Sequence, residues 1–299
     1  MHFGISVPNN QGVRAMGDLV ELAVEAEAMG YQSAWVSDHL FHAEYVAKRL
    51  DDRPYHEPLT VLTAIAARTE AIELGTSVLV LPWHHPVRLA KTIASLDDYS
   101  GGRVNLGVGV GVTQDEYAAL GVPFAERGRI ADEMLGAMRA LWTQAVPEFH
   151  GKYYDFAGLR FEPKPMQTPY PTIWVGGNSP AAHRRLCEFG EAWHPLGIGP
   201  DDLALKADEL AERLRAVGRE PQVPIAVRLM LEFRDEASDY PIGRRKTCKG
   251  TPAEMIALID AFANAGVTHV IVDGGTHHLD EATRAFEKFS KEVVPAVNA

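Results

Sequence analysis

Short apolar runs alternate with longer amphipathic stretches from one end of this 299-residue chain to the other, and this alternation restricts the fold more than any single motif. A buried strand followed by an amphipathic helix, repeated along a chain, predicts parallel strands joined by helical crossovers. Eight such units can be recognised, and they predict a (β/α)8 barrel of the TIM type. The expected strands cover residues 3–7, 33–37, 73–81, 104–110, 172–175, 192–195, 224–231 and 268–272.

The amphipathic stretches between these runs predict the helices that surround the barrel. A barrel of this type needs about 250 residues, so we expect one domain over residues 1–299 that contains one insertion. The expected helices cover residues 19–29, 58–69, 86–99, 125–144, 180–189, 201–217, 252–265 and 279–294.

The insertion is expected at residues 145–171, after the fourth helix, where the alternation stops. This segment is rich in proline and in aromatic residues. Long ordered connections inside a compact domain are usually functional. We therefore expect residues 145–171 to act as a substrate lid whose aromatic side chains shape an apolar pocket.

The balance of charges excludes several classes of partner. Asp and Glu number 40 against 29 Lys and Arg, which gives a formal net charge of −11. An acidic chain without a basic run repels nucleic acids and anionic membranes, so we expect neither as a partner. No apolar run reaches the roughly 18 residues that a membrane span needs. Cys187 and Cys248 are far apart and form no CxxC pair, so we expect no metal cluster and a cytoplasmic location.

Polar residues stand at or near the carboxyl ends of two expected strands, where barrel enzymes carry their active sites. Asp38 and His39 follow the second strand directly, and His39 can donate or accept a proton near neutral pH. Ser77 and Val78 lie inside the third apolar run. The simpler alternatives are a helix-capping Asp38, a loop His39 and a Ser77 hydroxyl bonded within its strand. The position at the strand end favours a site role for Asp38 and His39.

The run Gly107–Val112 resembles a glycine-rich dinucleotide-binding motif, but it lacks the third glycine of that motif at the required offset. No acidic residue follows a second strand at the place that would bind a ribose. Glycine at alternate strand positions instead allows a flat ring to approach the backbone. We therefore reject a Rossmann domain here.

The best candidate for an anion site is the segment Trp174–Pro180. An expected strand ends in Gly176 and Gly177, whose bare amides precede a helix with Pro180 in its first turn. Exposed N–H groups and a helix N-terminus favour a phosphate. The alternative is an ordinary N-cap by Asn178 or Ser179, which does not exclude a ligand. Arg184 and Arg185 follow one turn later and could bind an acidic tail or could be solvated helix residues.

Several long blocks of the sequence together resemble one known family. The blocks are GYQSAWVSDHL, LGTSVLVLPWHHPVRLAKTIASLDDYSGGRVNLGVGVG, ALGVPFAERGRIADEMLGAMRALWT, FHGKYYDFAGLRFEPKP and PTIWVGGNSP. Over residues 3–197 the chain resembles the bacterial-luciferase-like superfamily of (β/α)8 oxidoreductases, which use FMN or the deazaflavin coenzyme F420. The F420-dependent branch is the more similar, and the resemblance weakens after about residue 199.

This resemblance implies roles for individual residues. Asp38 and His39 match the polar pair beside the redox-active ring, and we expect them to be the catalytic residues. The cofactor-binding positions that it implies are Ser77 and Val78, where relatives have a non-prolyl cis peptide, Val110 and Gly111 along the ring, and Gly176, Gly177, Asn178 and Ser179 at the phosphate. Arg184 and Arg185 are the candidates for the acidic tail of F420.

One departure from the family pattern concerns the substrate. Sugar-phosphate dehydrogenases of the F420 branch carry a carboxylate acid near Val112, and valine cannot transfer a proton. The nearby Asp115 and Glu116 are expected to start a surface turn. We therefore expect hydride transfer between F420 and a small organic substrate other than a sugar phosphate, with His39 as the proton donor or ring partner.

Three alternatives remain open. The first keeps the fold and uses FMN with O2 as a monooxygenase. The second is a metal-dependent barrel hydrolase that would use His39, His84, His194 and His277. The third is a non-catalytic protein that binds the cofactor without turnover. The family resemblance also suggests a homodimer.

Overall fold

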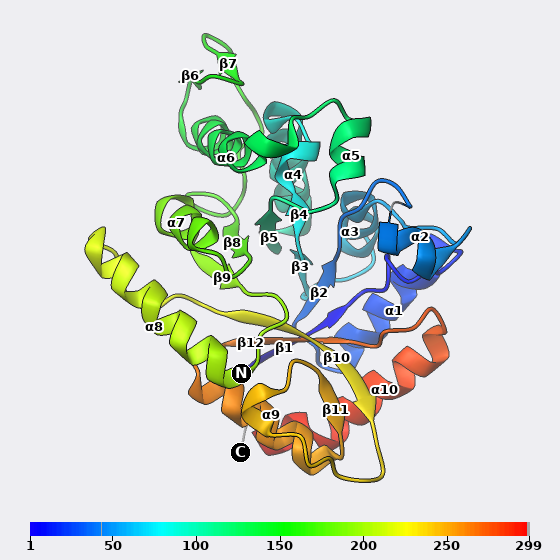
Figure 1. Ribbon diagram of the computed structural model, residues 1–299. Coiled ribbons are helices and arrows are strands. Elements are labelled where there is room, and N and C mark those ends of the chain that lie inside the picture. Colours follow the sequence, from blue (N-terminus) through cyan, green and yellow to red (C-terminus); the bar gives the residue numbers. More distant parts are fainter. Residues whose placement is uncertain (43, 298–299) are drawn as a thin grey trace.

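The computed structural model describes residues 1–42 and 44–297, which form an α/β structure with a central parallel sheet and helices outside it (Figure 1). Hydrogen-bonded strands follow the order β11-β10-β12-β1-β2-β3-β5-β8-β9, and β4 pairs with β5. The strands are β1 (His2–Ser6), β2 (Ser33–Val36), β3 (Glu73–Thr76), β4 (Leu79–Val80), β5 (Val104–Gly109), β8 (Thr172–Gly176), β9 (Ala192–His194), β10 (Ala226–Phe233), β11 (Cys248–Gly250) and β12 (His269–Asp273).

The helices cover the outer face of the sheet with their apolar sides. Proline occupies the first position of α3, α4, α7, α8 and α9, where a missing N–H costs nothing. The helices are α1 (Met16–Ala28), α2 (Glu44–Leu50), α3 (Pro58–Ala66), α4 (Pro86–Ser100), α5 (Gln114–Ala119), α6 (Arg127–Thr143), α7 (Pro180–Phe189), α8 (Pro200–Ala216), α9 (Pro252–Asn264), α10 (Leu279–Glu292) and α11 (Val294–Val297). No helix in the described ranges is long and apolar enough to cross a membrane.

Side chains from five strands meet on the inner face of the sheet, so the sheet curves around them. The inner cluster consists of Trp35, Trp174, Ala192, Ala226 and Ile271, all fully or almost fully buried. A parallel bridge that pairs residues 193 and 225 brings β9 beside the start of β10. β9, at one end of the strand order, therefore lies next to β10, near the other end, and strands lie on both sides of the inner cluster.

The indole of Trp35 fills the middle of this interior and explains two glycines on neighbouring strands. A Cβ at Gly75 would lie 2.2 Å from Cδ2 of Trp35, and a Cβ at Gly4 would lie 3.1 Å from its Nε1. The same Nε1 donates a hydrogen bond to the hydroxyl of Ser33 over 2.8 Å. Trp174 packs edge-on against Trp35, with 5.7 Å between ring centroids. These two indoles form a layer across the sheet interior.

Each expected strand region contains an observed strand, but the third expected strand is divided. The peptide between Ser77 and Val78 is cis, as the family resemblance implied, and it separates β3 from β4. The helices α2 and α5 were not expected from the sequence, because they are short and lie in the connections after β2 and β5.

Residues 145–171 contain a short hairpin, β6 (Phe149–His150) and β7 (Asp155–Phe156), which lies beside α6 (Figure 1). Phe149 packs on Phe156 across the hairpin, and Phe161 is buried in the main core. These three phenylalanines therefore pack against each other and the core, whereas Tyr153 and Tyr154 line a cavity of about 410 Å3 together with Trp83 and His84. The lid role of the segment stays a prediction.

Candidate active site at the carboxyl ends of the strands

A cavity of about 520 Å3 opens at the carboxyl ends of the central strands. Eight of the predicted site residues line it together. They are Asp38, His39, Ser77, Val78, Val110, Gly111, Gly176 and Gly177. The predicted Asn178, Ser179, Arg184 and Arg185 are not among the described residues that line it. Most of the residues predicted for the catalytic and cofactor-binding site therefore line one cavity.

Val78 forms one wall of the cavity and fits between two glycines on adjacent strands. A Cβ at Gly109 would lie 2.7 Å from Cγ2 of Val78, and a Cβ at Gly176 would lie 3.1 Å from its Cγ1. Gly107 faces the backbone of Thr76, whose carbonyl oxygen would be 1.7 Å from an added Cβ. The alternating glycines of β5 therefore accommodate the segment from Thr76 to Val78, of which Ser77 and Val78 line the cavity.

Asp38 anchors the end of β3 and β4. Its Oδ2 accepts a hydrogen bond from the amide of Val80 at 2.9 Å and from Nε2 of His84 at 3.1 Å. Its other oxygen, Oδ1, is buried and has no hydrogen-bond partner among the described residues. Asp38 is thus both a structural acceptor for the neighbouring strand and a source of one unsatisfied carboxylate oxygen at the cavity.

His39 is held by Glu116, a residue that the sequence interpretation placed on a surface turn. That interpretation is wrong, since Glu116 is completely buried on α5. Its carboxylate lies 2.7 Å from Nδ1 of His39 and accepts the amides of Leu40 and Phe41. Burial alone would raise the pKa of Glu116, but the hydrogen bonds from His39, Phe41 and Leu40 outweigh it and lower the pKa. An ionised Glu116 accepts from His39, so Nδ1 carries a proton.

The sequence contained a weak signal for Glu116, the partner of His39 that was not predicted. Glu116 lies within the first turn of a short helix directly after the glycine strand, and acidic residues there are common at exposed positions. Only the packing of α5 over the segment from His39 to Phe41 turns this carboxylate inward. Because α5 has just six residues, periodicity could not reveal which of its faces is buried.

His194, at the end of β9, is a neutral imidazole whose proton has a defined position. Its Nδ1 lies 2.8 Å from the carbonyl oxygen of Ala226, which can only accept, so Nδ1 is protonated. Its Nε2 therefore accepts from the hydroxyl of Ser77 at 2.8 Å. Burial, reinforced by the charge of Arg228, lowers the pKa of His194 to about 4. The Ser77 hydroxyl is thus oriented by a histidine that stays uncharged at neutral pH.

Arg228 brings a positive charge to the cavity and was not among the predicted residues. Its guanidinium donates to Oδ2 of Asp273 at 2.6 Å and 3.0 Å and to the hydroxyl of Ser37 at 2.6 Å. Both members of the Arg228–Asp273 pair have mostly buried side chains. An arginine inside the apolar stretch 224–231 was the available signal, because a charge in a buried strand needs a partner.

The predicted anion-binding turn differs in detail from the expectation. The amide of Gly177 is not bare, since it donates to the carbonyl oxygen of His194 at 3.1 Å. The side chain of Asn178 bonds both backbone groups of Leu196. Ser179 is the N-cap of α7 and accepts from the amide of Ala182. The turn therefore ties β8 to the loop after β9 and presents a capped helix N-terminus beside the cavity.

Arg184 and Arg185 share one carboxylate on the neighbouring helix α6. Arg184 Nη2 lies 2.7 Å and Arg185 Nε lies 2.6 Å from the two oxygens of Asp132. Arg185 is buried and also donates to the carbonyl oxygen of Gly128. Arg184 has an exposed side chain. Arg185 thus joins α7 to α6, and Arg184 is the arginine of this pair that solvent reaches.

The histidines of the metal-hydrolase alternative do not converge. His39 is bonded to Glu116, His84 to Asp38 and His194 to Ser77. His277 lies in a different surface groove, 2.8 Å from the guanidinium of Arg53. The structure therefore does not support a metal centre built from these four side chains.

A larger groove, of about 820 Å3, runs along the outer faces of α3 and α4. It is lined by helix residues such as Thr60, Thr63, Arg88 and Thr92 and contains no residue of β1–β5. Active sites of parallel α/β proteins lie at the carboxyl ends of strands. The smaller, strand-end cavity is therefore the candidate active site.

Known proteins with similar sequences include both monooxygenases and dehydrogenases. The FMNH(2)-dependent dimethylsulfone monooxygenase of Pseudomonas putida is 30% identical over 258 residues, which cover 85% of this chain and 66% of that protein. The F420-dependent glucose-6-phosphate dehydrogenase of Amycolatopsis mediterranei is 26% identical over an alignment of 327 positions, gaps included, that covers 94% of this chain and 95% of that protein. The relatives thus use two different cofactors.

Solved structures share the fold along its whole length. A monooxygenase from Streptomyces bottropensis superposes with a TM-score of 0.84 at 23% identity and covers 99% of both chains. An F420-dependent secondary alcohol dehydrogenase superposes with a TM-score of 0.81 at 20% identity, covering 99% of this chain and 98% of that one. A family model described as luciferase-like monooxygenase matches residues 1–241, and it confirms the predicted resemblance. The chain therefore belongs to the luciferase-like monooxygenase family, whose members are oxidoreductases that use F420 or FMN.

Proposed function

We propose that this protein transfers a hydride between coenzyme F420 and a small, uncharged organic substrate. The observation that carries the proposal is the strand-end cavity, which has an apolar wall at Val78 and polar groups from His39, Ser77, His194 and Arg228 around it. An apolar wall with polar groups around it suits a tricyclic ring with a hydrogen-bonding edge. The cavity volume also lies within the usual range of ligand sites.

Unsatisfied polar atoms support the fit of such a ring. Buried atoms without hydrogen-bond partners among the described residues include Asn10 Oδ1, Asp38 Oδ1, Trp83 Nε1 and Thr113 Oγ1. All four residues line the cavity. Buried polar groups are normally bonded, and this set offers both an N–H donor and oxygen acceptors. A heteroaromatic ring with carbonyl and N–H groups could satisfy both kinds.

The residues of the chain would orient the reactants and handle the proton, while F420, when bound, would supply or accept the hydride. His39 carries a proton on Nδ1 because of Glu116, and Nε2 is then the ring atom through which it exchanges a proton with substrate. Asp38 would position Val80 and His84 at the cavity edge. Val110 and Gly111 would lie along the ring.

The anionic tail would leave the cavity past the turn formed by Gly176, Gly177, Asn178 and Ser179. Ser179 begins α7, and a helix N-terminus favours a phosphate. Beyond the turn, Arg184 is exposed and could meet the carboxylates of a polyglutamate tail. Arg185 would act through Asp132, which both arginines contact.

We extend the proposal to the architecture. The parallel order and the bridge between residues 193 and 225 support a complete (β/α)8 barrel in a single domain, with residues 145–171 as the insertion and lid. Family resemblance supports a cytoplasmic homodimer with small molecules as its partners. Membranes and nucleic acids are not expected partners of a chain with net charge −11.

A second function, FMN-dependent monooxygenation with O2, is supported by the relative from Pseudomonas putida. The same cavity would hold FMN, whose short phosphate tail does not need Arg184. A third function is cofactor binding without turnover, which the side chain of Val112 favours, since it is 79% exposed at the cavity and cannot transfer a proton.

Titration of the purified protein with F420 and, separately, with FMN tests the cofactor, with the fluorescence of each ring as the readout. We expect micromolar binding of F420 that weakens in Arg184→Ala and does not change in the control Arg129→Ala. An equal loss of FMN affinity in Arg184→Ala would contradict the tail assignment. If neither ring binds at micromolar concentration, the proposed function is wrong.

Turnover tests the role of His39. We expect His39→Asn to bind F420 as the wild type does and to lose about 100-fold or more of the rate with a reactive carbonyl or imine substrate. Unchanged turnover in His39→Asn would remove this residue from the mechanism. Tight F420 binding without any donor or acceptor activity in the wild type would support the non-catalytic alternative.

A further inference from the structure

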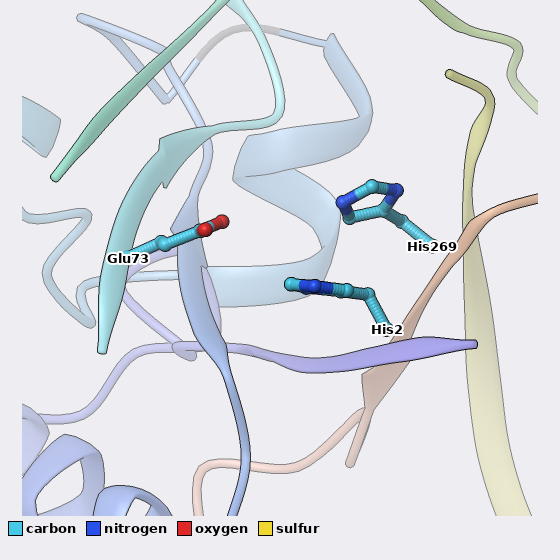
Figure 2. A group of neighbouring side chains, drawn as sticks. All are labelled: His2, Glu73 and His269. Carbon is cyan, nitrogen blue, oxygen red and sulfur yellow. The ribbon is translucent and has the colours of Figure 1, made fainter. Parts of the chain in front are cut away.

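A second polar cluster lies at the opposite end of the sheet interior, at the first residues of three strands. His2 begins β1, Glu73 begins β3 and His269 begins β12. His2 and His269 are direct partners in the parallel ladder. One ligand atom from each of the three side chains lies within 4.8 Å of the others. Figure 2 shows the carboxylate of Glu73 directed at the two imidazoles.

We propose that His2, Glu73 and His269 bind a divalent transition-metal ion such as Zn2+, Co2+ or Ni2+. Two imidazoles and one carboxylate are the donor set that such borderline ions prefer, whereas Mg2+ and Ca2+ prefer oxygen ligands. Three protein ligands would leave further coordination positions for water. The site does not depend on the proposed function, since it uses none of the residues of the strand-end cavity.

Neighbouring side chains orient Glu73 through hydrogen bonds, as outer partners commonly orient the ligands of a metal site. Its Oε2 accepts from Nδ2 of Asn105 at 2.8 Å, and Oδ1 of Asn105 accepts from Nε1 of Trp174 at 3.0 Å. The ring of Trp174 also packs edge-on against His269, with centroids 4.8 Å apart. These contacts fix one carboxylate oxygen and leave the other, Oε1, to face an ion.

The Nδ1 atom of His269 is occupied by a neighbouring hydroxyl. It lies 2.8 Å from Oγ1 of Thr268, which also lies 3.2 Å from the carbonyl oxygen of Ile225 and accepts from the amide of Ile225 at 3.0 Å. With Nδ1 bonded to this hydroxyl, Nε2 is the ring atom of His269 that can bind a metal.

His2 supplies the observation that points most directly to a ligand. Its Nδ1 is buried and has no hydrogen-bond partner among the described residues. Its ring lies beside that of His269, with centroids 4.6 Å apart and planes inclined by 36°. A buried ring nitrogen normally has a partner, and an ion between His2 and Glu73 would provide one.

The ion would tie together three strands that are not consecutive in the chain. Since metal binding to a folded site stabilises the native state by mass action, the protein should unfold at a higher temperature when the ion is present. The Trp35–Trp174 layer lies between this cluster and the strand-end cavity, so the effect is expected on stability and not on the chemistry of the cavity.

Untagged protein that begins at Met1, stripped with a chelator and titrated with Co2+ and Zn2+, tests the proposal. We expect one equivalent of Co2+ to give visible absorption of a low-coordinate nitrogen–oxygen site, and one equivalent of Zn2+ to abolish it. Zn2+ should also raise the unfolding temperature of the wild type.

Variants distinguish this site from surface binding. Glu73→Gln keeps an oxygen for Asn105 and should lose the Co2+ spectrum. The other ligand variants, His2→Ala and His269→Gln, should lose it as well. Asn105→Ala, which removes the partner of Glu73, should weaken Co2+ binding about tenfold or more. His150→Ala is the control, because His150 is an exposed histidine between two carboxylates. The absence of Co2+ binding to the wild type, or equal binding in wild type, Glu73→Gln and His2→Ala, would overturn the proposal. If one variant fails to fold, the other ligand variant gives the same readout.

Discussion

Replacing Glu116 by Gln removes the charge of a completely buried carboxylate without changing its size. In the native protein this carboxylate accepts the imidazole of His39 and the amides of Leu40 and Phe41. Gln keeps one oxygen for the two amides, and its NH2 group then faces Nδ1 of His39. His39 can accept from that group only as its other neutral tautomer, and all three hydrogen bonds lose the charge of the carboxylate.

The expected cost follows from these contacts. A hydrogen bond to a charged group is worth about 1.5–3 kcal/mol, so Glu116→Gln should lower the free energy of unfolding by about that amount. Glu116→Ala should cost more, because it leaves three buried donors without an acceptor. Asp115→Asn, at an exposed neighbouring position, is the control and should change stability by less than about 0.5 kcal/mol.

The effect should depend on pH with a definite sign. The hydrogen bonds of Glu116 lower its folded-state pKa below the ordinary 4.5, despite the opposing effect of burial. A depressed carboxyl pKa contributes stability that is present above the unfolded-state pKa and is lost as the pH falls through the folded-state pKa. The difference between wild type and Glu116→Gln should therefore be largest above pH 4.5 and shrink below it.

Urea unfolding at pH 7 and at a series of lower pH values measures both quantities. The same buffers can report the pH profile of turnover for the wild type and for Glu116→Gln. A Glu116→Gln protein as stable as the wild type at pH 7 would show that the carboxylate is not a buried acceptor. A stability difference that stays constant through pH 3 would refute the assigned pKa direction.

Further predictions concern the cavity wall and the neutral histidine. Gly109→Ala places a Cβ 2.7 Å from Val78 Cγ2 and should cost about 1–3 kcal/mol in urea unfolding as well as cofactor affinity; Gly17→Ala, with open space at its Cβ, should cost nothing. NMR of the His194 ring should show a neutral imidazole from pH 7 down to about pH 5, because its pKa is lowered to about 4; a titration near 6.5 would contradict this. Since that folded-state pKa is depressed, stability should fall as the pH drops from 6.5 towards 4, by about 3 kcal/mol, and His194→Gln should remove this pH dependence. Chelation of bound metal should lower the unfolding temperature of the wild type and leave that of Glu73→Gln unchanged.

The order of strands and helices could be predicted because each unit repeats a local pattern. The short run 268–272 is rich in β-branched residues and predicts a buried strand, and the proline at the start of α7 or α9 marks where a helix begins. Residues directly after strands, such as Asp38 and His39, follow from the same pattern. These features depend on neighbours in the chain, and a sequence displays them directly.

What the sequence did not predict depends on contacts between distant segments. Glu116 is buried only because α5 packs on the segment after β2, 75 to 77 residues earlier in the chain. Arg228 finds its partners on β12 and beside β2. The glycines of β5 were interpreted as room for a ring, whereas Val78 and Thr76 occupy that space. In each case the identity of the residue was visible, but its partner was not.

The indole of Trp35 has a consequence for how the two polar ends of the molecule communicate. Its ring packs against His194, which lines the strand-end cavity, and against Trp174. The inner cluster around these two indoles contains no charged side chain, so bulky neutral side chains separate the two rims. Substitutions at the two rims should therefore have additive effects, which leaves an engineer free to remodel one end while the other keeps its properties.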